Sequence, residues 1–213
     1  MATPRTLAQK AYFKALRNNT RPIVVATGPA GCGKTLIACN VAAERLHTKQ
    51  VERVVITRPT VTVDEDLGYL PGKLEDKMDP YMRPIMDIMG NYFTRTRIQQ
   101  MINNGVLEIA PLAFMRGRTF DKSFIIGDEM QNATQSQMKM ILTRLGEDSK
   151  MAITGDIEQT DLPVDTPSGL LDLVTTIQDV HSELEYIDHV ALTDVDIQRH
   201  EAVKEVLKLY DNA

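Results

Sequence analysis

The feature that most constrains this chain is the octapeptide GPAGCGKT at residues 28–35, which fits the pattern GxxxxGKT. An apolar, β-branched run at residues 23–27 precedes it, and a helix-forming run at residues 34–46 follows it. A glycine-rich turn between a strand and a helix aims backbone N–H groups at phosphate oxygens, and the helix N-terminus adds a favourable dipole. A chance glycine-rich turn before Lys-Thr would lack these flanks. The sequence therefore predicts a phosphate-binding loop within an α/β fold.

The residue types in this loop suit a nucleoside triphosphate. Lys34 is expected to reach the β- and γ-phosphates and to act in catalysis, and Thr35 is expected to bind Mg²⁺. We therefore expect ATP and Mg²⁺ as cofactors. The remaining contacts to the nucleotide are expected from Gly28, Pro29, Ala30, Gly31, Cys32 and Gly33.

Short β-branched runs alternate with longer helical runs along the chain, which predicts a mostly parallel sheet with helices on both faces. No repeat or Pro/Gly-rich linker interrupts this pattern, so we expect one domain over residues 1–213. The expected strands are residues 23–27, 54–57, 106–110, 124–127, 151–154 and 184–190. The expected helices are residues 34–46, 80–103, 136–145 and 198–210.

Two acidic residues, Asp128 and Glu129, follow the apolar run at residues 123–127. A neighbouring parallel strand would bring both carboxylates to the edge of the sheet that carries the phosphate loop. Asp128 suits the Mg²⁺ shell, and Glu129 suits the base that orients and deprotonates an attacking water. The alternative is a solvent-facing acidic pair at a strand end, as most surface carboxylates are. The phosphate loop favours the catalytic interpretation.

A further strand at residues 151–154 leads into Gly-Asp and then Gln159. Gln159 is a candidate for a contact with the γ-phosphate or with the attacking water. An exposed glutamine in a turn explains the same pattern equally well. Both interpretations stay open from the sequence.

Composition limits the remaining classes. The cysteines, Cys32 and Cys39, lack zinc-site spacing, which favours a reducing, cytoplasmic setting. The sequence has no secretion-signal pattern at its start and no apolar run of about 18 residues, so we expect no membrane association. The formal net charge of −5 argues against a non-specific nucleic-acid coat protein but permits a local basic surface.

The order of the motifs resembles the PhoH-like protein family, single-domain ATPases whose core is similar to the first motor domain of superfamily 1 RNA and DNA helicases. The resemblance spans nearly the whole chain. It implies a single RecA-like P-loop NTPase domain that hydrolyses ATP and acts on single-stranded RNA or DNA. The motifs that carry it are GPAGCGKT, ITRP at residues 56–59, LGYLPGKLEDKMDPY at 67–81, RGRTF at 116–120, IIGDEMQN at 125–132, TGDIEQTD at 154–161 and DIQRH at 196–200.

The resemblance also implies roles for individual residues. Asp128, Glu129 and Gln131 take the places of the helicase DExQ box, in which the glutamine couples the nucleotide to the second site. Gln9 resembles the amino-terminal glutamine that reads the adenine edge. An ordinary position on a helix surface is the alternative for Gln9, because glutamine is a good helix former.

The ITRPT segment resembles the loop that grips a single-stranded backbone, which makes Thr57, Arg58 and Thr60 candidates for phosphate contacts. The insert that continues to residue 79 is expected on the same face. Its acidic residues oppose phosphate, so binding should be weak and strongly salt-dependent, with RNA favoured over DNA. On this expectation, removal of Arg58 lowers affinity for all strands and leaves basal hydrolysis nearly unchanged. A plain surface charge is the alternative for Arg58.

One departure from the helicases is that this chain is long enough for one motor domain only. The resemblance implies a homo-oligomeric ring, with a hexamer expected, in which an arginine from a neighbour completes each site. Arg118 and Arg199 are the leading candidates, followed by Arg116, for which a surface salt bridge is the alternative. The sequence shows no nuclease module.

Two other classes of function compete with the motor interpretation. A P-loop small-molecule kinase would use the insert at residues 58–79 as a substrate lid. A nucleotide-controlled switch would hydrolyse ATP only feebly, and a dedicated base at Glu129 argues against it.

Overall fold

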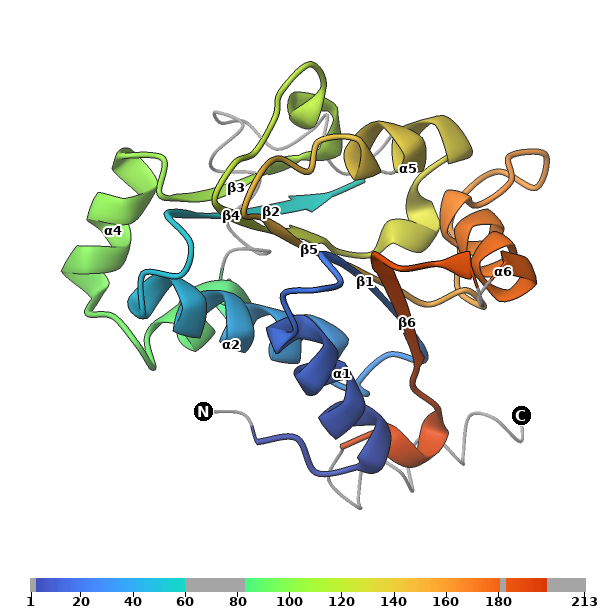
Figure 1. Cartoon of the computed structure of the whole chain (residues 1–213), viewed down its shortest axis with the longest axis horizontal. Helices are drawn as coiled ribbons and strands as arrows, with labels where there is room; N and C mark the ends of the chain where they lie inside the picture. Colours follow the sequence, from blue (N-terminus) through green and yellow to red (C-terminus); the bar gives the residue numbers. More distant parts are fainter. Residues whose placement is uncertain (1–2, 60–82, 181–182, 199–213) are drawn as a thin grey trace.

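The computed structural model describes residues 3–59, 83–180 and 183–198, and the fold is built on one sheet of six parallel strands. The spatial order of the strands is β3-β2-β4-β5-β1-β6 (Figure 1). Non-consecutive neighbours require crossover connections, which is why helices separate the strands along the chain. The strands are β1 (Ile23–Thr27), β2 (Arg53–Arg58), β3 (Leu107–Pro111), β4 (Ser123–Gly127), β5 (Lys150–Gly155) and β6 (Ile187–Ala191).

Helices cover both faces of this sheet. In Figure 1, α1, α2 and α4 lie on one side, and α5 and α6 lie on the other. Their bounds are α1 (Leu7–Arg17), α2 (Lys34–His47), α4 (Arg95–Asn103), α5 (Gln135–Leu142) and α6 (Gly169–Val180), and residues 83–89 are also helical. Short 3₁₀ segments lie at η1 (Leu112–Met115), η2 (Met130–Asn132) and η4 (Asp194–Asp196).

The alternation of side chains along each strand produces two separate hydrophobic cores. Val54 and Ile56 of β2 face the core under α1, α2 and α4, whereas Val55 between them faces the core under α5 and α6. Successive side chains of a strand point to opposite faces, so a strand covered on both sides is apolar throughout. This explains why the strands read as continuous β-branched runs in the sequence.

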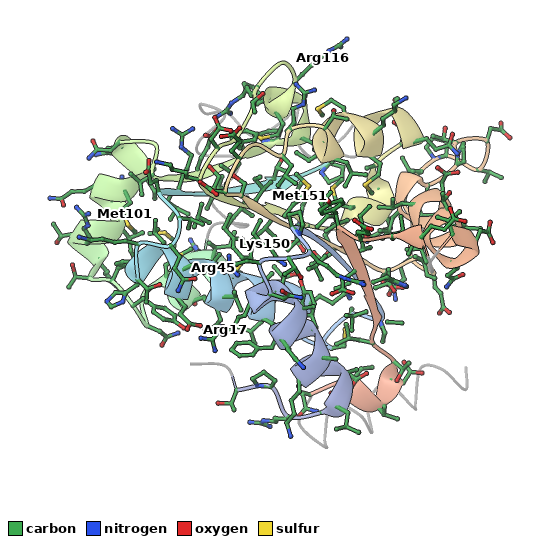
Figure 2. All side chains as sticks on the ribbon, viewed as in Figure 1. Arg17, Arg45, Met101, Arg116, Lys150 and Met151 are labelled. Carbon is green, nitrogen blue, oxygen red and sulfur yellow. The ribbon has the colours of Figure 1, made fainter. Side chains whose placement is uncertain are left out.

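A buried lysine joins helix α1 to the sheet. Lys150, the first residue of β5, is 1% exposed, and Figure 2 shows it between the sheet and the helices beside Arg45. Its Nζ donates hydrogen bonds to the carbonyls of Ala15 at 2.8 Å, Asn18 at 2.7 Å and Arg21 at 2.5 Å. These carbonyls lie in the last turn of α1 and beyond its end, where the regular hydrogen bonds of a helix run out. Lys150 thereby fixes the end of α1 against the sheet.

The structure confirms the α/β fold class, the parallel sheet and all six expected strands; β1 has the expected bounds, and the bounds of the other five are shifted. The last strand starts at Ile187, three residues later than expected, and α5 ends at Leu142. The single helix expected over residues 80–103 is wrong, because residues 90–93 are not helical and Thr94 caps a new helix by accepting from Arg97 N. The expected helices do not include α6, and the sequence indicates a helix at α1 only through the alternative for Gln9. The helix expected over residues 198–210 lies almost wholly outside the described residues.

The topology brings the predicted site residues together. Since all six strands are parallel, their carboxyl ends meet at one edge of the sheet. The phosphate loop follows β1, the acidic pair follows β4, Asp156 follows β5, and Arg58 ends β2. Open parallel sheets bind ligands at this edge.

Candidate functional site

The phosphate loop is shaped by glycines with backbone conformations that other residues rarely adopt. The φ angles of Gly28, Gly31 and Gly33 are 144°, 85° and 90°. A Cβ atom at Gly28 would lie 2.4 Å from the carbonyl oxygen of Leu192, so the loop passes this backbone too closely for any side chain. The loop thus has the tight, amide-rich shape that phosphate binding needs.

The ammonium group of Lys34 lies within this loop. Its Nζ donates to the carbonyls of Gly28 at 2.5 Å and Pro29 at 2.9 Å, and it lies 3.6 Å from Cys32 Sγ. The Lys34 ammonium therefore lies inside the loop. Phosphate oxygens of a bound nucleotide would replace the Gly28 and Pro29 carbonyls as its acceptors. Burial raises the pKa of the Cys32 thiol, while Lys34 opposes that rise, so Cys32 is a neutral part of the loop.

Asp128 is the point at which three elements meet. Its Oδ1 accepts from Thr35 Oγ1 at 2.6 Å and from Thr154 Oγ1 at 2.7 Å, and its Oδ2 accepts from Arg58 at 2.9 Å. Thr35 lies in the first turn of α2 next to the loop, Thr154 lies on β5, and Arg58 ends β2. A hydroxyl and a carboxylate side by side at the end of the phosphate loop are oxygen ligands of the kind that Mg²⁺ prefers. The donor set fits the ion predicted for Thr35 and Asp128.

Glu129 has a strained backbone conformation. Its φ and ψ of 51° and 40° place a residue other than glycine in the left-handed region. Such a conformation costs about 1–2 kcal/mol and is concentrated at functional sites. The side chain is 43% exposed, so water reaches it.

The side-chain amide of Gln131 connects Glu129 to the next strand. Its Nε2 donates to Glu129 Oε2 at 2.7 Å, and its Oε1 accepts from the backbone N–H of Asp156 at 3.1 Å. Gln131 is 4% exposed. Its backbone carbonyl accepts from Ser168 Oγ at 2.8 Å and from Thr160 Oγ1 at 3.2 Å. Both ends of the amide are therefore used, and Gln131 orients Glu129 relative to the end of β5.

Arg58 contacts both acidic residues. Besides its hydrogen bond to Asp128, its NH2 lies 3.5 Å from Glu129 Oε1. The side chain is 34% exposed, whereas the Asp128 side chain is 9% exposed. This ion pair was not anticipated: the sequence predicts Arg58 as a contact to a nucleic-acid phosphate, independent of hydrolysis. The structure places its guanidinium in the candidate catalytic centre.

Gln9 lies against the back of the phosphate loop. Its Nε2 donates to the carbonyls of Cys32 and Asp196, each at 3.0 Å, and its Oε1 accepts from Arg5 N at 2.9 Å. The residue is 4% exposed, so the helix-surface interpretation is wrong. Reading of adenine by Gln9 stays a prediction, and it requires exchange of at least one of these hydrogen bonds.

The remaining candidates are an exposed turn residue, a buried strand residue and residues outside the described part of the chain. Gln159 is exposed in the turn after Asp156, and its backbone N–H donates to the Asp156 carbonyl at 3.2 Å. Thr57 is 1% exposed, and its hydroxyl is buried without a hydrogen-bond partner, so the structure does not present that hydroxyl to a nucleic acid. Thr60, Arg199 and most of the insert at residues 58–79 lie outside the described residues.

Arg118 is held at the edge strand β3 by residues of its own chain. Its guanidinium donates to both carboxylate oxygens of Glu108 on β3, at 2.5 and 2.7 Å, and stacks 4.6 Å from the ring centroid of Phe120. Hydrogen bonding from Arg118 lowers the pKa of the Glu108 carboxyl. A role in a neighbour's site would require this bidentate pair to open. Arg116 is exposed and points away from the molecule in Figure 2.

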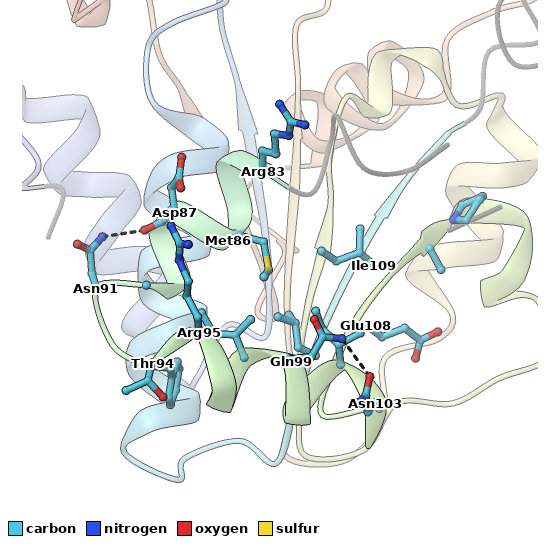
Figure 3. Close-up of a pocket in the computed structure, with 18 of the residues that line it drawn as sticks. Arg83, Met86, Asp87, Asn91, Thr94, Arg95, Gln99, Asn103, Glu108 and Ile109 are labelled. Carbon is cyan, nitrogen blue, oxygen red and sulfur yellow. Dashed lines mark hydrogen bonds between the residues drawn. The ribbon is translucent and has the colours of Figure 1, made fainter. Parts of the chain in front are cut away.

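A groove of about 1350 Å³ lies at the β3 edge of the sheet, away from the phosphate loop. Figure 3 shows its wall of residues from the 83–89 helix and α4, including Met86, Asp87 and Gln99, with Glu108 and Ile109 of β3 opposite. None of the predicted nucleotide-binding residues lines it among the described residues. The groove is therefore separate from the candidate nucleotide site.

Within the described residues no helix is long and apolar enough to cross a membrane.

Comparison with known proteins shows which family the chain resembles. A family model described as PhoH-like protein matches residues 1–211. A PhoH-like protein of Mycobacterium tuberculosis (strain ATCC 25618 / H37Rv) is 47% identical over 210 residues, which are 97% of this chain and 57% of that protein. A PhoH-like protein of Bacillus subtilis (strain 168) is 41% identical over 207 residues, 97% of this chain and 63% of that protein. The chain thus spans little more than half the length of these relatives.

A solved structure supports the fold. The UvsW helicase from bacteriophage T4 matches with a TM-score of 0.54 over 90% of this chain and 61% of that chain, at 14% sequence identity. At that identity the likeness concerns the fold alone. The family match over almost the full sequence and the arrangement of loop, acids and sheet lead to one conclusion: this chain belongs to the PhoH-like protein family and has its RecA-like P-loop NTPase fold.

Proposed function

We propose that this protein binds and hydrolyses ATP with Mg²⁺ and uses the reaction to act on single-stranded RNA or DNA. The observation that carries the proposal is the 2.6 Å hydrogen bond between Thr35 Oγ1 and Asp128 Oδ1. It joins the phosphate loop to the strand end that also carries Glu129. A strand-end acid bonded to the loop hydroxyl is the arrangement that nucleotide hydrolysis requires, because phosphoryl transfer depends on positioning and charge stabilisation.

Each residue of the cluster has a definite part in this proposal. Lys34 binds the β- and γ-phosphate oxygens in place of the loop carbonyls. Thr35 and Asp128 would hold Mg²⁺, which when bound neutralises charge that develops on the phosphates. Glu129 accepts a proton from the attacking water, whose oxygen bonds to the γ-phosphorus as the bond to the β-phosphate oxygen breaks and ADP leaves. Gln131 keeps the Glu129 carboxylate oriented.

The oligomeric part of the proposal is a homo-oligomeric ring, with a hexamer favoured, in which Arg199, Arg118 or Arg116 reaches a neighbour's γ-phosphate. Its support is the partly exposed Glu129, which leaves the γ-phosphate side of the site open to a partner. An arginine supplied from another subunit contributes about 10³ to 10⁵ in rate where it occurs.

The test is ATP turnover by wild-type protein and by the Lys34→Ala variant, with and without a single-stranded oligouridylate. We expect wild-type turnover that rises with the oligonucleotide, and a loss of at least about 10²-fold in Lys34→Ala, since a cation on the transferred phosphate is removed. Transfer of the γ-phosphate to an added small molecule instead of water would favour the kinase alternative. Absence of turnover in the wild-type protein would refute the proposal.

A further inference from the structure

We propose that Arg58 is a positioning residue that exchanges between two anionic partners: the acids Asp128 and Glu129 when the enzyme is idle, and a backbone phosphate of a nucleic-acid strand when one is bound. This inference rests on the proposed function and adds a mechanism by which strand binding controls hydrolysis. It assigns to Arg58 a regulatory contact that the sequence alone does not indicate.

The first support is the position of Arg58 in the sheet. Strand β2 pairs in parallel with β4, with Thr57 opposite Gly127, and the backbone N–H of Asp128 donates to the Thr57 carbonyl at 2.9 Å. Arg58 and Asp128 therefore follow directly after the last paired residues of two adjacent strands. This register holds the guanidinium beside both acids.

The second support is the state of Glu129. Arg58 engages its Oε1 at 3.5 Å, and Gln131 engages its Oε2 at 2.7 Å. Both carboxylate oxygens thus have a partner in the protein, although the side chain is 43% exposed and within reach of water. The Gln131 contact is buried and tied to Asp156, so it orients the base. The Arg58 contact is the more exposed of the two and is the one that can be released.

The third support is the chemistry of the guanidinium. Arg58 is 34% exposed at the edge of the sheet where ligands bind, so a second anion can approach it. A planar guanidinium accepts a phosphate as readily as a carboxylate, in the same forked geometry. Ion pairs that are partly exposed are weak, so a backbone phosphate of the nucleic acid competes with Asp128 and Glu129 for Arg58. When a nucleic-acid phosphate binds the Arg58 guanidinium, Glu129 Oε1 becomes available to accept a hydrogen bond from the attacking water.

Arg58→Gln separates this inference from a purely structural or purely binding role. We expect basal ATP turnover of this variant to rise about fivefold, as loss of a weak ion pair allows, and its stimulation by a single-stranded oligouridylate to disappear. Arg58→Lys, which keeps the charge without the fork, should lie between the two. The matched control is Arg53→Gln at the opposite end of the same strand, which is exposed and should behave as wild type. Melting temperatures of all three variants should stay close to wild type.

Binding measurements give a readout that does not depend on turnover. Without nucleotide, Glu129→Gln should bind labelled oligouridylate about two- to threefold more tightly than wild type, because the acids hold Arg58 less firmly and the coupling is reciprocal. Arg58→Gln should bind labelled oligouridylate, and oligonucleotides of other base sequences, more weakly to the same degree. The slope of log affinity against log salt concentration should fall by the amount that corresponds to about one phosphate contact.

The outcomes distinguish this inference from the proposed function. Wild-type protein without turnover or strand binding refutes the proposed function. Two results would overturn the exchange and leave the proposed function in place, provided that the oligonucleotide stimulates the wild-type protein. In the first, the oligonucleotide stimulates Arg58→Gln equally. In the second, the basal turnover of Arg58→Gln is at or below the wild-type rate. Unchanged strand affinity in Glu129→Gln also overturns it.

Discussion

The side-chain amide of Gln131 donates a 2.7 Å hydrogen bond from Nε2 to Glu129 Oε2, and its Oε1 accepts from the backbone N–H of Asp156. The side chain that presents the candidate base is therefore oriented by the end of β5, the strand that lies between β4 and β1. A shift of β5 relative to β4 would move Glu129 with it. The amide is thus a direct mechanical connection between two strand ends.

Gln131→Ala should lower turnover about 10- to 100-fold, because Glu129 loses its orientation while the phosphate loop stays intact. It should also lower the free energy of unfolding by about 1–2 kcal/mol, since the buried Asp156 N–H loses its acceptor. Steady-state kinetics and urea titration measure the two effects. Gln135→Ala, at an exposed position on α5, is the matched control, and equal turnover in both variants would contradict the role of Gln131.

Glu129→Gln should retain nucleotide binding and lose turnover, because the amide keeps the shape of the side chain but accepts no proton from water. A fluorescent ATP analogue measures binding, and phosphate release measures turnover. Hydrolysis at the normal rate would rule out Glu129 as the base.

Glu129→Gly tests the backbone strain separately. Glycine adopts a φ of 51° without the cost that other residues have, so this inactive variant should unfold with a free energy equal to or up to about 1 kcal/mol above that of Glu129→Gln. A lower free energy of unfolding in Glu129→Gly would show that side-chain contacts outweigh the strain.

Lys150 predicts a dependence of stability on pH. Burial, together with the positive charge of Arg45, lowers the pKa of Lys150 to about 7, below the usual value of about 10.4, although three carbonyls accept from its ammonium form. Between these two pKa values the unfolded chain binds more protons than the folded chain at this site. The Lys150 contribution to the free energy of unfolding therefore rises with pH from about 7, by up to about 1.4 kcal/mol per pH unit.

Lys150→Met should remove this pH dependence. It leaves three carbonyls without their donor, which costs about 2–3 kcal/mol, but it also removes the unfavourable burial of the charge. The stability of the variant relative to wild type should therefore fall from pH 7 to pH 9. Urea titrations at pH 7, 8 and 9 measure both the loss and the change in slope. Lys139→Met, at an exposed position on α5, controls for loss of a positive charge. An identical pH slope in Lys150→Met and wild type would contradict the lowered pKa.

Subunit mixing tests the arginine that completes the site. Lys34→Ala and Arg199→Ala are each expected to be inactive alone, and an equal mixture should regain activity in about a quarter of the interfaces if the two residues act across an interface. The same experiment with Arg118→Ala and Arg116→Ala identifies which arginine is used. A fully active monomer at working concentration would exclude all three.

Much of the fold and the central site follow from local sequence patterns. The phosphate loop, the acidic pair and the strands are each encoded within a short segment, so spacing alone locates them. Helix α1 is not among the expected helices, although its capping box, Thr6 with Gln9, is a readable signal. The break in the expected helix over residues 80–103 was also readable, from Gly90 and the cap at Thr94.

The contacts that join the strand ends could not be predicted in the same way. Arg58 meets Asp128 only because β2 lies beside β4 in a particular register, and Thr154 meets Asp128 only because β5 lies on the other side. Strand order is a property of the whole sheet and leaves no mark in the segments themselves. The link from Gln9 to Asp196 spans 187 positions and depends on the same assembly.

The order of the strands also determines when the site can form during synthesis. Strand β1 carries the phosphate loop, yet its two neighbours in the sheet are β5 and β6, which lie more than a hundred residues later in the chain. A nascent chain that has exposed the loop, Arg58 and even the acidic pair has no partner for β1 until residues 150–155 leave the ribosome. Contacts this distant in sequence slow folding because a long loop must close first. The nucleotide site is thus assembled only after β5 has joined β1, and ATP should act as a ligand of the assembled sheet and not of the shorter nascent fragments.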